Sequence, residues 1–512
     1  MFYSILFPGP EHQPVQDSEP DFFKDLNLDR IISPLLRAER DYGLEGIYRT
    51  ALKDRDAVLY RQDILRELDG SPAGAYLDRF SKEMHGLGKF LTVLRKRLGT
   101  ADGRHGSFLS QGHLLDCAER YCSMTEELYK TMSSFSHKSR GLSEFTVFLQ
   151  DYCSGPEFCS LRDTVSGLRE SFSALEYCMF IKNGTVKVQK YDGEDDLSSQ
   201  VLRYFERFRQ GDVKDYRQHL SEEPFADHVE AAVLSLLSRI YPEEFEALEK
   251  FTSDFLYFEN GTLMRFAREV RFYISWLGYM EKHRKNGLPF CIPELTESGE
   301  HMYAYGFYDL ALADIIGSGT VLNDFTLDAP ERIIVVTGPN QGGKTTFARA
   351  VGQLHYLASL GLSVPCSDAC LLMHDGIFTH FGREEDLSSL NGRLQDDLER
   401  LHSILERAGS RSLVIVNEIF SSTTLRDAVS LGTKMMDALR DLRSAGVVVT
   451  FMDELALHGP EAVSMMSIVE PDRPDERSYR ILRRPPDGLA YALYIAGRHG
   501  LTYEQLTRRL RA

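Results

Sequence analysis

The residues with the clearest capacity for chemistry lie in TGPNQGGKTT, residues 337–346. Gly338, Gly343, Lys344 and Thr345 have the spacing of a phosphate-binding P-loop, between the apolar run RIIVV and the helical pattern FARAVGQLHYLASL. Glycines let backbone amides curl around phosphate oxygens, and the start of the next helix adds a positive partial charge. The pattern in this context predicts a nucleotide site rather than a glycine-rich turn with a stray lysine.

Each residue type in this loop has an expected role. Lys344 would reach the β- and γ-phosphates as a point charge and act in catalysis, and the Thr345 hydroxyl would bind Mg²⁺. ATP and Mg²⁺ are therefore the expected cofactors. The candidate nucleotide-binding residues are Gly338, Pro339, Asn340, Gln341, Gly342, Gly343, Lys344, Thr345 and Thr346.

A second group of candidate site residues lies about 70 residues downstream, where the apolar strand-like run LVIV (413–416) is followed by Asn417 and Glu418. In many ATPases such a strand ends in two carboxylates that steady Mg²⁺ and activate water. Asn417 would contact the metal through its water shell, and Glu418 would orient or deprotonate the attacking water as a general base. The alternative for Glu418 is a strand-end carboxylate satisfied by a cap or an ion pair; its distance from the loop favours the catalytic role.

The elements that must position these residues differ along the chain. Residues 1–290 show helical periodicity, and in 75–99 the apolar residues fall on one stripe at three- and four-residue steps. Alternation over 180–194 around Asn183-Gly184 predicts a small hairpin. Residues 291–330 form a connector, and 331–512 alternate apolar strand-length runs with helical stretches. We therefore expect a mixed fold, mainly α-helical at first and then an α/β P-loop domain of the ABC type.

Composition limits the location and the partners. No run of about 18 apolar residues and no signal peptide is present, which predicts a cytoplasmic protein with no membrane contact. The net charge is −17, and by count about −15 of it lies in residues 1–330. An acidic helical half argues against broad, non-specific wrapping of nucleic acid but leaves room for a local basic patch. The eight cysteines are expected to be reduced thiols.

With both motifs placed, the chain resembles the MutS family of DNA mismatch-repair ATPases. TGPNQGGKTT is close to the family's TGPN-x-GGKST loop, NEIFSSTTLRDA is similar to its DEIGRGTSTYDG segment, and PDGLAYALYIAGRHGL is similar to its closing segment. The resemblance is strong over about 320–500 and weaker before it, where a helical core and lever are implied. It also implies ATP hydrolysis, a homodimer through the ATPase domains, and Thr423 and Asp427 near the partner subunit.

Several positions depart from the family pattern. Asn417 replaces an aspartate, Phe451 replaces the histidine that follows the fourth-strand threonine, and the signature serine aligns with Gly392 or, after a two-residue shift, with Leu394. The aromatic residue that stacks on adenine is not evident near 320–322, and neither a mismatch-reading domain with its Phe-x-Glu wedge nor a full C-terminal helix-turn-helix is expected. The pattern indicates a short MutS-like branch without mismatch recognition.

Two functions follow as hypotheses. The first is a dimeric ATPase whose nucleotide state moves long helices that clamp mismatched, branched or damaged DNA. The second is a nucleotide-dependent conformational switch or scaffold with slow hydrolysis, because an amide in place of a carboxylate removes charge beside the metal. The DNA structure, the pathway, the hydrolysis rate and the partner proteins do not follow from the residues.

Overall fold

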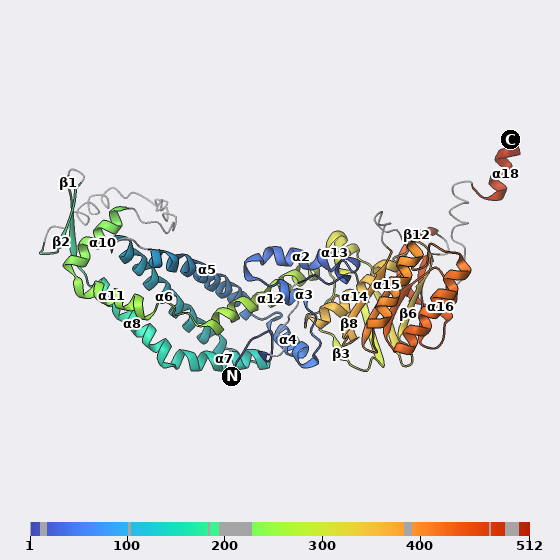
Figure 1. The fold of residues 1–512 in the computed structure, drawn as a ribbon, viewed down its shortest axis with the longest axis horizontal. Helices are drawn as coiled ribbons and strands as arrows, with labels where there is room; N and C mark the ends of the chain where they lie inside the picture. Colours follow the sequence, from blue (N-terminus) through green and yellow to red (C-terminus); the bar gives the residue numbers. More distant parts are fainter. Residues whose placement is uncertain are drawn as a thin grey trace, which may run out of the picture. The chain divides into compact units, whose positions relative to one another are not determined.

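The computed structural model describes residues 2–10, 18–100, 104–182, 185–193, 228–382, 392–470, 473–486 and 501–511. The chain divides into two compact units. The helical unit comprises Ala75–Ser136 and Glu144–Ala267, and the sheet unit comprises Phe2–Gly74, His137–Ser143 and the residues from Arg268 onward. Because helices and several β-sheets are both present (Figure 1), the expected mixed class of fold is confirmed.

The helical unit is built from long helices and one hairpin. Three helices have residues in both units, so three of the four points at which the chain changes unit lie inside a helix. These three are α5 (Ala73–Thr100), α7 (Arg140–Ser154) and α12 (Gly261–Arg284). The remaining elements are α6 (Arg104–Ser133), α8 (Pro156–Ser173), β1 (Tyr177–Lys182), β2 (Thr185–Lys190), α10 (His228–Ile240) and α11 (Pro242–Asp254).

The amphipathic stripe of α5 forms part of the core of the helical unit. Leu77, Met84 and Leu91 are fully buried, as expected for residues spaced at helical intervals on one face. Gly88 lies so close to the neighbouring helix that a Cβ there would be 2.8 Å from the Met264 Cε atom. Apolar packing therefore joins helices of this unit, and a side chain at position 88 would require the flexible end of Met264 to move.

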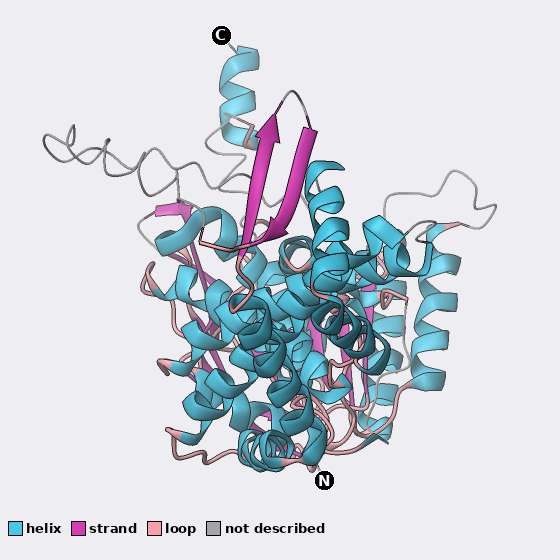
Figure 2. Ribbon diagram, turned by 90° about the vertical axis from the view of Figure 1, so that its left-hand side faces the viewer, coloured by secondary structure: helices cyan, strands magenta, loops and turns pink. Residues whose placement is uncertain are grey.

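The hairpin is a separate ribbon within this unit. β1 and β2 pair antiparallel from Tyr177↔Lys190 to Lys182↔Thr185, and Figure 2 shows them as a two-stranded magenta pair. Asn183 and Gly184, on which the turn was predicted, lie outside the described residues.

The sheet unit contains two sheets and the helices around them. The six-stranded sheet has the order β12-β11-β6-β10-β9-β8, and the four-stranded sheet has the order β3-β7-β4-β5. The strands are β3 (Glu294–Thr296), β4 (His301–Phe307), β5 (Asn323–Asp328), β6 (Ile333–Thr337), β7 (Asp368–Leu372), β8 (Gly376–Phe381), β9 (Ser412–Asn417), β10 (Ala445–Val449), β11 (Ala462–Glu470) and β12 (Arg473–Arg483). The helices are α1 (Phe22–Asp25), α2 (Leu28–Ala38), η2 (Arg40–Tyr42), α3 (Glu45–Arg49), α4 (Arg55–Leu68), α13 (Leu310–Ile316), η3 (Gly317–Gly319), α14 (Lys344–Ser359), α15 (Arg393–Arg407), α16 (Leu425–Leu442), η4 (Asp453–Leu457) and α18 (Tyr503–Arg511).

The six-stranded sheet is parallel except for β12, which pairs antiparallel with β11. β6, β9 and β10 are continuous apolar runs because helices cover both faces of the sheet (Figure 1). On one face, residues of α15 and α16 such as Ile404 and Met435 pack in one cluster with Val335, Val414 and Val448. α14 packs on the opposite face, where a Cβ at Gly352 would be 2.8 Å from the Ile415 Cδ1 atom.

Phe2–Gly74 belong to the sheet unit rather than to a helical region that ends near residue 290. The reason is direct packing on α14: the Arg349 Nε atom donates to the Asp25 carbonyl oxygen at 2.9 Å, and the Tyr356 hydroxyl donates to the Tyr48 carbonyl oxygen at 2.7 Å. The apolar residues at the start of the chain also belong to the core of the sheet unit, because Ile5 and Leu6 are fully buried. None of the helices within the described ranges is long and apolar enough to cross a membrane.

Candidate functional site

The glycine-rich loop lies between β6 and α14, at the edge of the sheet where the parallel strands end. Val449 at the end of β10 pairs with Val336 of β6 on one side and with Asn417 of β9 on the other. Ligands of open parallel sheets bind at this carboxyl edge, because the loops there are free to contact them. The register therefore brings the Asn417-Glu418 pair next to the loop although the two are about 70 residues apart in the chain.

The loop depends on its glycines because β11 passes directly against it. Gly338 has φ +115°, and a Cβ there would lie 3.0 Å from the Ser467 Cβ atom. A Cβ at Gly342 would lie 2.2 Å from the Ser467 Oγ atom, and this hydroxyl donates a hydrogen bond to the Gly342 carbonyl oxygen at 2.8 Å. Gly343 (φ +91°) is the N-cap residue of α14, so the loop delivers its backbone directly to a helix N-terminus.

Lys344, the first residue of α14, is buried and its ammonium group is held by the loop itself. The Nζ atom donates to the carbonyl oxygens of Gly338 and Pro339 at 3.0 and 3.1 Å, and to the Asn340 Oδ1 atom at 3.4 Å. Burial lowers the pKa of Lys344, while the Glu418 carboxylate, 4.0 Å away, acts in the opposite direction. The lysine is thus a desolvated cation at the loop, which strengthens its attraction for an anion.

Thr345 and Asn417 are in direct contact. The Thr345 Oγ1 atom donates a hydrogen bond to the Asn417 Oδ1 atom at 3.0 Å. An amide oxygen accepts this bond as a carboxylate oxygen would, so the amide retains the orienting contact but not the negative charge. The departure at 417 therefore changes the electrostatics of the site more than its geometry.

Glu418 follows β9 in a strained conformation. Its φ is +53°, a left-handed value that is uncommon outside glycine, and its backbone amide is held by the Val449 carbonyl oxygen at 2.9 Å. Its carboxylate is about half exposed and lies on the wall of the cavity described below. Such strain is typical of residues that a surrounding structure holds in place for function.

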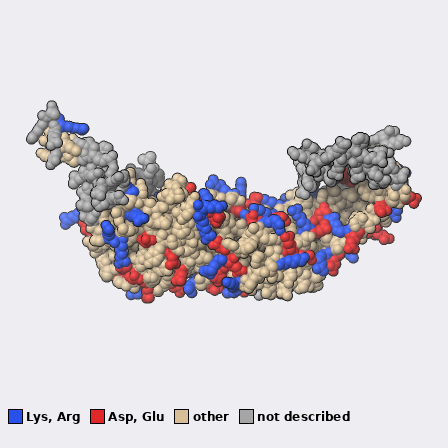
Figure 3. Space-filling model, turned by 180° about the vertical axis from the view of Figure 1, so that it is seen from behind, with Lys and Arg blue, Asp and Glu red and all other residues tan. Residues whose placement is uncertain are grey.

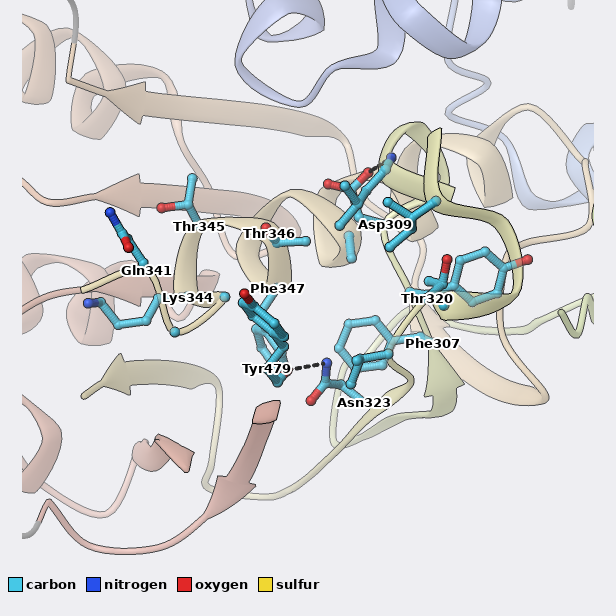
Figure 4. A pocket seen from close by; sticks show the side chains of 18 of the residues that line it. Phe307, Asp309, Thr320, Asn323, Gln341, Lys344, Thr345, Thr346, Phe347 and Tyr479 are labelled. Atoms are coloured by element: carbon cyan, nitrogen blue, oxygen red, sulfur yellow. Dashed lines mark hydrogen bonds between the residues drawn. The ribbon is translucent and has the colours of Figure 1, made fainter. Parts of the chain in front are cut away.

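These residues border a cavity of about 480 Å³. Gln341–Thr346 and Glu418 line one end, which we call the phosphate end. Lining residues from 307–323, together with Tyr479, form the remainder, which we call the outer end. In Figure 4, Lys344, Gln341 and Thr345 lie at one side of the view, and Phe307, Asp309 and Thr320 lie at the other. The volume and elongated arrangement suit a small ligand with an anionic end and a less polar end.

Tyr479 and Asn323 are site residues that the motif analysis missed. Tyr479 of β12 lines the cavity with φ +56° and lies beside the loop: a Cβ at Gly343 would be 3.7 Å from its Cβ atom. The Asn323 side chain holds this part of β12, because it donates to the Tyr479 carbonyl oxygen at 3.4 Å and accepts from the Ile481 amide at 2.8 Å (Figure 4). The two residues are 156 positions apart, so no local pattern signals the pair.

A buried carboxylate lies at the outer end. Asp309 is the N-cap residue of α13, accepting from the Leu312 amide at 3.1 Å, and it also accepts from the Gln353 Nε2 atom of α14 at 2.9 Å. Burial raises the pKa of Asp309, and its hydrogen bonds act against this effect. Because the same Gln353 Nε2 atom donates to the Leu26 carbonyl oxygen at 2.9 Å, this network links α13, α14 and the turn before α2.

Other positions singled out by the sequence do not line the cavity. Asp427 lies in the first turn of α16, where its amide donates to the hydroxyl of the N-cap residue Thr424 and its carboxylate accepts from that hydroxyl. Gly392 is the exposed N-cap residue of α15, and Leu394 packs against the core cluster beneath that helix. Phe451 is half exposed after β10. Thr423 is partly buried and precedes α16. Residues 383–391 lie outside the described residues, and so do residues 487–500, which make up most of the segment PDGLAYALYIAGRHGL.

The donor set fits a hard divalent cation. The Thr345 hydroxyl, the Asn417 amide oxygen and the Glu418 carboxylate are all oxygen ligands, which Mg²⁺ prefers, and they meet at the edge of the sheet beside the loop. Two carboxylates would bind such an ion more strongly than one carboxylate and one amide. The arrangement therefore suits Mg²⁺ that arrives together with the phosphates of a nucleotide.

A mainly parallel sheet with a glycine-rich loop between a strand and a helix N-terminus is the arrangement typical of nucleotide-binding domains of the P-loop class. Residues 334–476 match the family model of MutS domain V. The chain is 33% identical over 193 residues to the endonuclease MutS2 of Thermus thermophilus, covering 37% of this chain and 25% of that protein. It is 30% identical over 183 residues to the DNA mismatch repair protein MutS of the same species, with coverages of 36% and 23%.

A eukaryotic relative shows the same partial match: the chain is 32% identical over 171 residues to the DNA mismatch repair protein msh3 of Botryotinia fuckeliana, covering 33% of this chain and 15% of that protein. The chain thus spans about a quarter or less of the length of these relatives. Residues 334–476 of the chain are thus similar to MutS domain V and to the matching part of these MutS proteins, in line with the resemblance seen in the sequence.

Proposed function

We propose that the chain binds ATP with Mg²⁺ in the cavity of the sheet unit, hydrolyses it, and couples the bound nucleotide to clamping of DNA by the helical unit. The observation that carries the ATP-binding part is the contact between Thr345 and Asn417 beside the buried Lys344, at the phosphate end of the cavity. The match of residues 334–476 to MutS domain V supports the same conclusion.

The triphosphate would lie along the loop. Backbone amides of residues 338–343 and the N-terminus of α14 would bind the phosphate oxygens, and Lys344 would exchange its bonds to the loop carbonyl oxygens for bonds to the β- and γ-phosphates. Bound Mg²⁺ would neutralise charge that develops between those phosphates. The nucleoside would extend toward the outer end, where the Tyr479 ring and the buried Phe307 supply aromatic surface.

Hydrolysis needs a water molecule aligned with the γ-phosphate. Glu418 borders the phosphate end, its carboxylate is half exposed, and its backbone is held by β10, so it is positioned to accept a proton from that water. Lys344, 4.0 Å from the Glu418 carboxylate, would stabilise negative charge on the phosphate that is released. The products would be ADP and inorganic phosphate.

Coupling to DNA would pass along the helices that have residues in both units. Asp314 of α13 accepts hydrogen bonds from Tyr279 and Lys282 of α12 at 2.5 and 2.6 Å. Because Leu312 and Ile316 of the same short helix line the cavity, a nucleotide that moves α13 would also act on α12. We propose that α5, α7 and α12 transmit this change, and that two copies pair through their ATPase domains.

The distribution of charge shapes the DNA part of the proposal. On the face drawn in Figure 3, basic side chains are interspersed with acidic ones across the described residues rather than gathered in one basic surface. Contacts of this face with DNA phosphates would then be local and few, so affinity that depends on this face should fall only moderately as salt increases. Binding that is absent even at low salt would contradict the DNA part while leaving the nucleotide site in place.

A second function has its own support. Asn417 is neutral, and Lys344 is already satisfied by three oxygen atoms of its own loop. Both features would weaken the hold on Mg²⁺ and phosphate, which favours a switch that binds nucleotide and hydrolyses it slowly. In that case the nucleotide shifts a conformational equilibrium, and hydrolysis only resets it.

Steady-state ATPase rates of three variants separate the two functions. Glu418→Gln should lower turnover by roughly 100-fold if Glu418 is the general base, and Glu406→Gln on α15 serves as a surface control. Asn417→Asp restores a carboxylate without changing size. A large rise in its rate would favour the slow switch, whereas little change would favour a site already suited to hydrolysis. Unchanged turnover in Glu418→Gln would remove Glu418 from the mechanism.

A further inference from the structure

Two thiols meet beside the nucleotide cavity. Cys291 lies in the segment between α12 and β3, and Cys366 lies between α14 and β7. Their Sγ atoms are 3.3 Å apart, a hydrogen-bonding contact between sulfur atoms. The two residues are 75 positions apart in the chain, so the tertiary structure alone brings them together.

The backbone holds both cysteines at the same point. Cys291 and Val364 form an antiparallel bridge, with N–O distances of 3.1 and 2.8 Å in the two directions. The Cys366 amide donates to the same Val364 carbonyl oxygen at 2.9 Å. Two amides that converge on one carbonyl oxygen keep the side chains adjacent without any bond between the sulfur atoms.

The two thiols differ in environment. Cys366 is fully buried, whereas Cys291 is partly exposed. The hydrogen bond with Cys291 and burial together raise the pKa of the Cys366 thiol, so this sulfur stays protonated until its neighbour reacts. The pair therefore has one accessible sulfur and one protected sulfur, an arrangement in which an oxidant meets Cys291 first.

We propose that Cys291 and Cys366 are a site of reversible oxidation, at which a hydroperoxide converts the two thiols into a disulfide. The sulfur atoms must approach by about 1.3 Å to reach the bond length of a disulfide. Small rotations of the two side chains about their Cα–Cβ bonds supply a movement of this size, because the backbone bridge at Val364 already fixes their separation.

The chemistry balances with the peroxide as oxidant. The Cys291 thiolate attacks one peroxide oxygen and breaks the O–O bond, giving a sulfenic acid and, after protonation, an alcohol or water. The Cys366 thiol then loses its proton and attacks the Cys291 sulfur, and the hydroxyl group leaves as water. Two thiols are oxidised by two electrons and one hydroperoxide is reduced; a dithiol or glutathione reverses the reaction.

The position of the pair gives the oxidation a consequence. Tyr308 lies between the two segments: its amide donates to the Pro365 carbonyl oxygen at 3.2 Å and its hydroxyl donates to the Pro289 carbonyl oxygen at 3.1 Å. Tyr308 also lines the cavity. A disulfide would fix both segments around this residue, so one wall of the cavity would become more rigid and bound nucleotide should exchange more slowly. This consequence rests on the proposed function, whereas the disulfide itself does not.

The test treats the full chain with hydrogen peroxide, then blocks free thiols and maps the peptides by mass spectrometry. A peptide pair linked through Cys291 and Cys366, reversed by dithiothreitol, is the expected result. The oxidised protein should also unfold at a Tm higher by roughly 5 °C, because the bond closes a long loop. Cys291→Ser should abolish the linkage and the Tm shift, and Cys370→Ser, a buried cysteine of β7, should leave both unchanged.

Several outcomes would overturn the proposal. Accumulation of sulfenic or sulfinic acid at Cys291 without the linkage would show that Cys366 does not reach it. Linkage of other cysteine pairs at the same peroxide concentration would show that the site is not selective. If the linkage forms but the rate of nucleotide exchange is the same in both redox states, the consequence for the cavity is wrong. Absence of nucleotide binding in the reduced protein would instead count against the proposed function.

Discussion

The two ends of the cavity are built in different ways. Consecutive residues of one loop form most of the phosphate end and use mainly their backbone, with Glu418 added from the end of a strand two places away in the sheet. The outer end is formed by side chains from β4, α13, β5 and β12. An end made by the backbone of adjacent residues has a recognisable residue pattern, while an end made by distant side chains has none. The two ends should also contribute separately to nucleotide binding.

The largest effect is expected at the phosphate end. Lys344→Ala removes a buried cation that donates into the loop, so affinity for both ATP and inorganic tripolyphosphate should fall roughly 100-fold. Fluorescence or calorimetric titration measures both ligands. Lys434→Ala on the exposed side of α16 is the matched control and should bind normally. Equal binding by the two variants would show that the lysine does not contact phosphate.

A smaller effect is expected from the loop backbone. Gly342→Ala places a Cβ 2.2 Å from the Ser467 Oγ atom, so the loop or β11 must shift and affinity for tripolyphosphate should fall roughly 10-fold. Ser467→Gly in the same chain removes the obstructing side chain and should restore most of the affinity. Failure of this second change to restore binding would indicate that the loop needs Gly342 for its conformation rather than for space.

The outer end should respond to the base and not to the phosphates. Tyr479→Ala removes aromatic surface and should lower ATP affinity about 5-fold, while tripolyphosphate affinity stays the same. Tyr479→Phe retains the ring and should bind ATP as the unmodified protein does. If Tyr479→Ala weakened both ligands equally, the tyrosine would act on the shape of the neighbouring loop at Gly343, and the two ends would not be independent.

The smallest effect is expected in the way the free energy of unfolding changes with pH. Burial raises the pKa of Asp309, so the unfolded chain loses this proton at a lower pH than the folded protein does. Stability contributed by the neutral carboxyl is therefore lost as pH rises from its ordinary pKa of about 4 through the raised value. Asp309→Asn keeps the helix cap and stays neutral, so chemical denaturation from pH 4 upward should show a smaller loss of stability. If Asp309→Asn and the unmodified protein lost stability equally as pH rises, ionisation of Asp309 would not destabilise the folded protein.

Much of the sheet unit follows from local patterns. The runs at β6, β9 and β10 are apolar throughout because helices cover both faces, and such runs are visible without a structure. The glycine-rich loop is equally visible, because close backbone approach to phosphate demands particular residue types at fixed spacing. The stripe of α5 was also predicted, and Leu77, Met84 and Leu91 are indeed buried.

Other features had no local signal. Asp25 and Tyr48, early in the chain, accept hydrogen bonds from Arg349 and Tyr356 of α14, and nothing in either segment alone identifies its partner. The left-handed backbone of Tyr479 arises where β12 crosses the loop and Asn323 holds it. The contact between Cys291 and Cys366 depends in the same way on a bridge between two loops.

The sequence by itself determined the glycine-rich loop, the strand that ends in Asn417-Glu418 and the similarity to MutS domain V. These depend on contacts between residues close in the chain or on residue types that a backbone geometry requires. The tertiary structure decided that Thr345 donates to Asn417, that Asp309 and Tyr479 face the same cavity as the loop, and that two thiols meet beside it. These arise from packing between distant segments, whose partners are chosen by shape and burial over the whole unit.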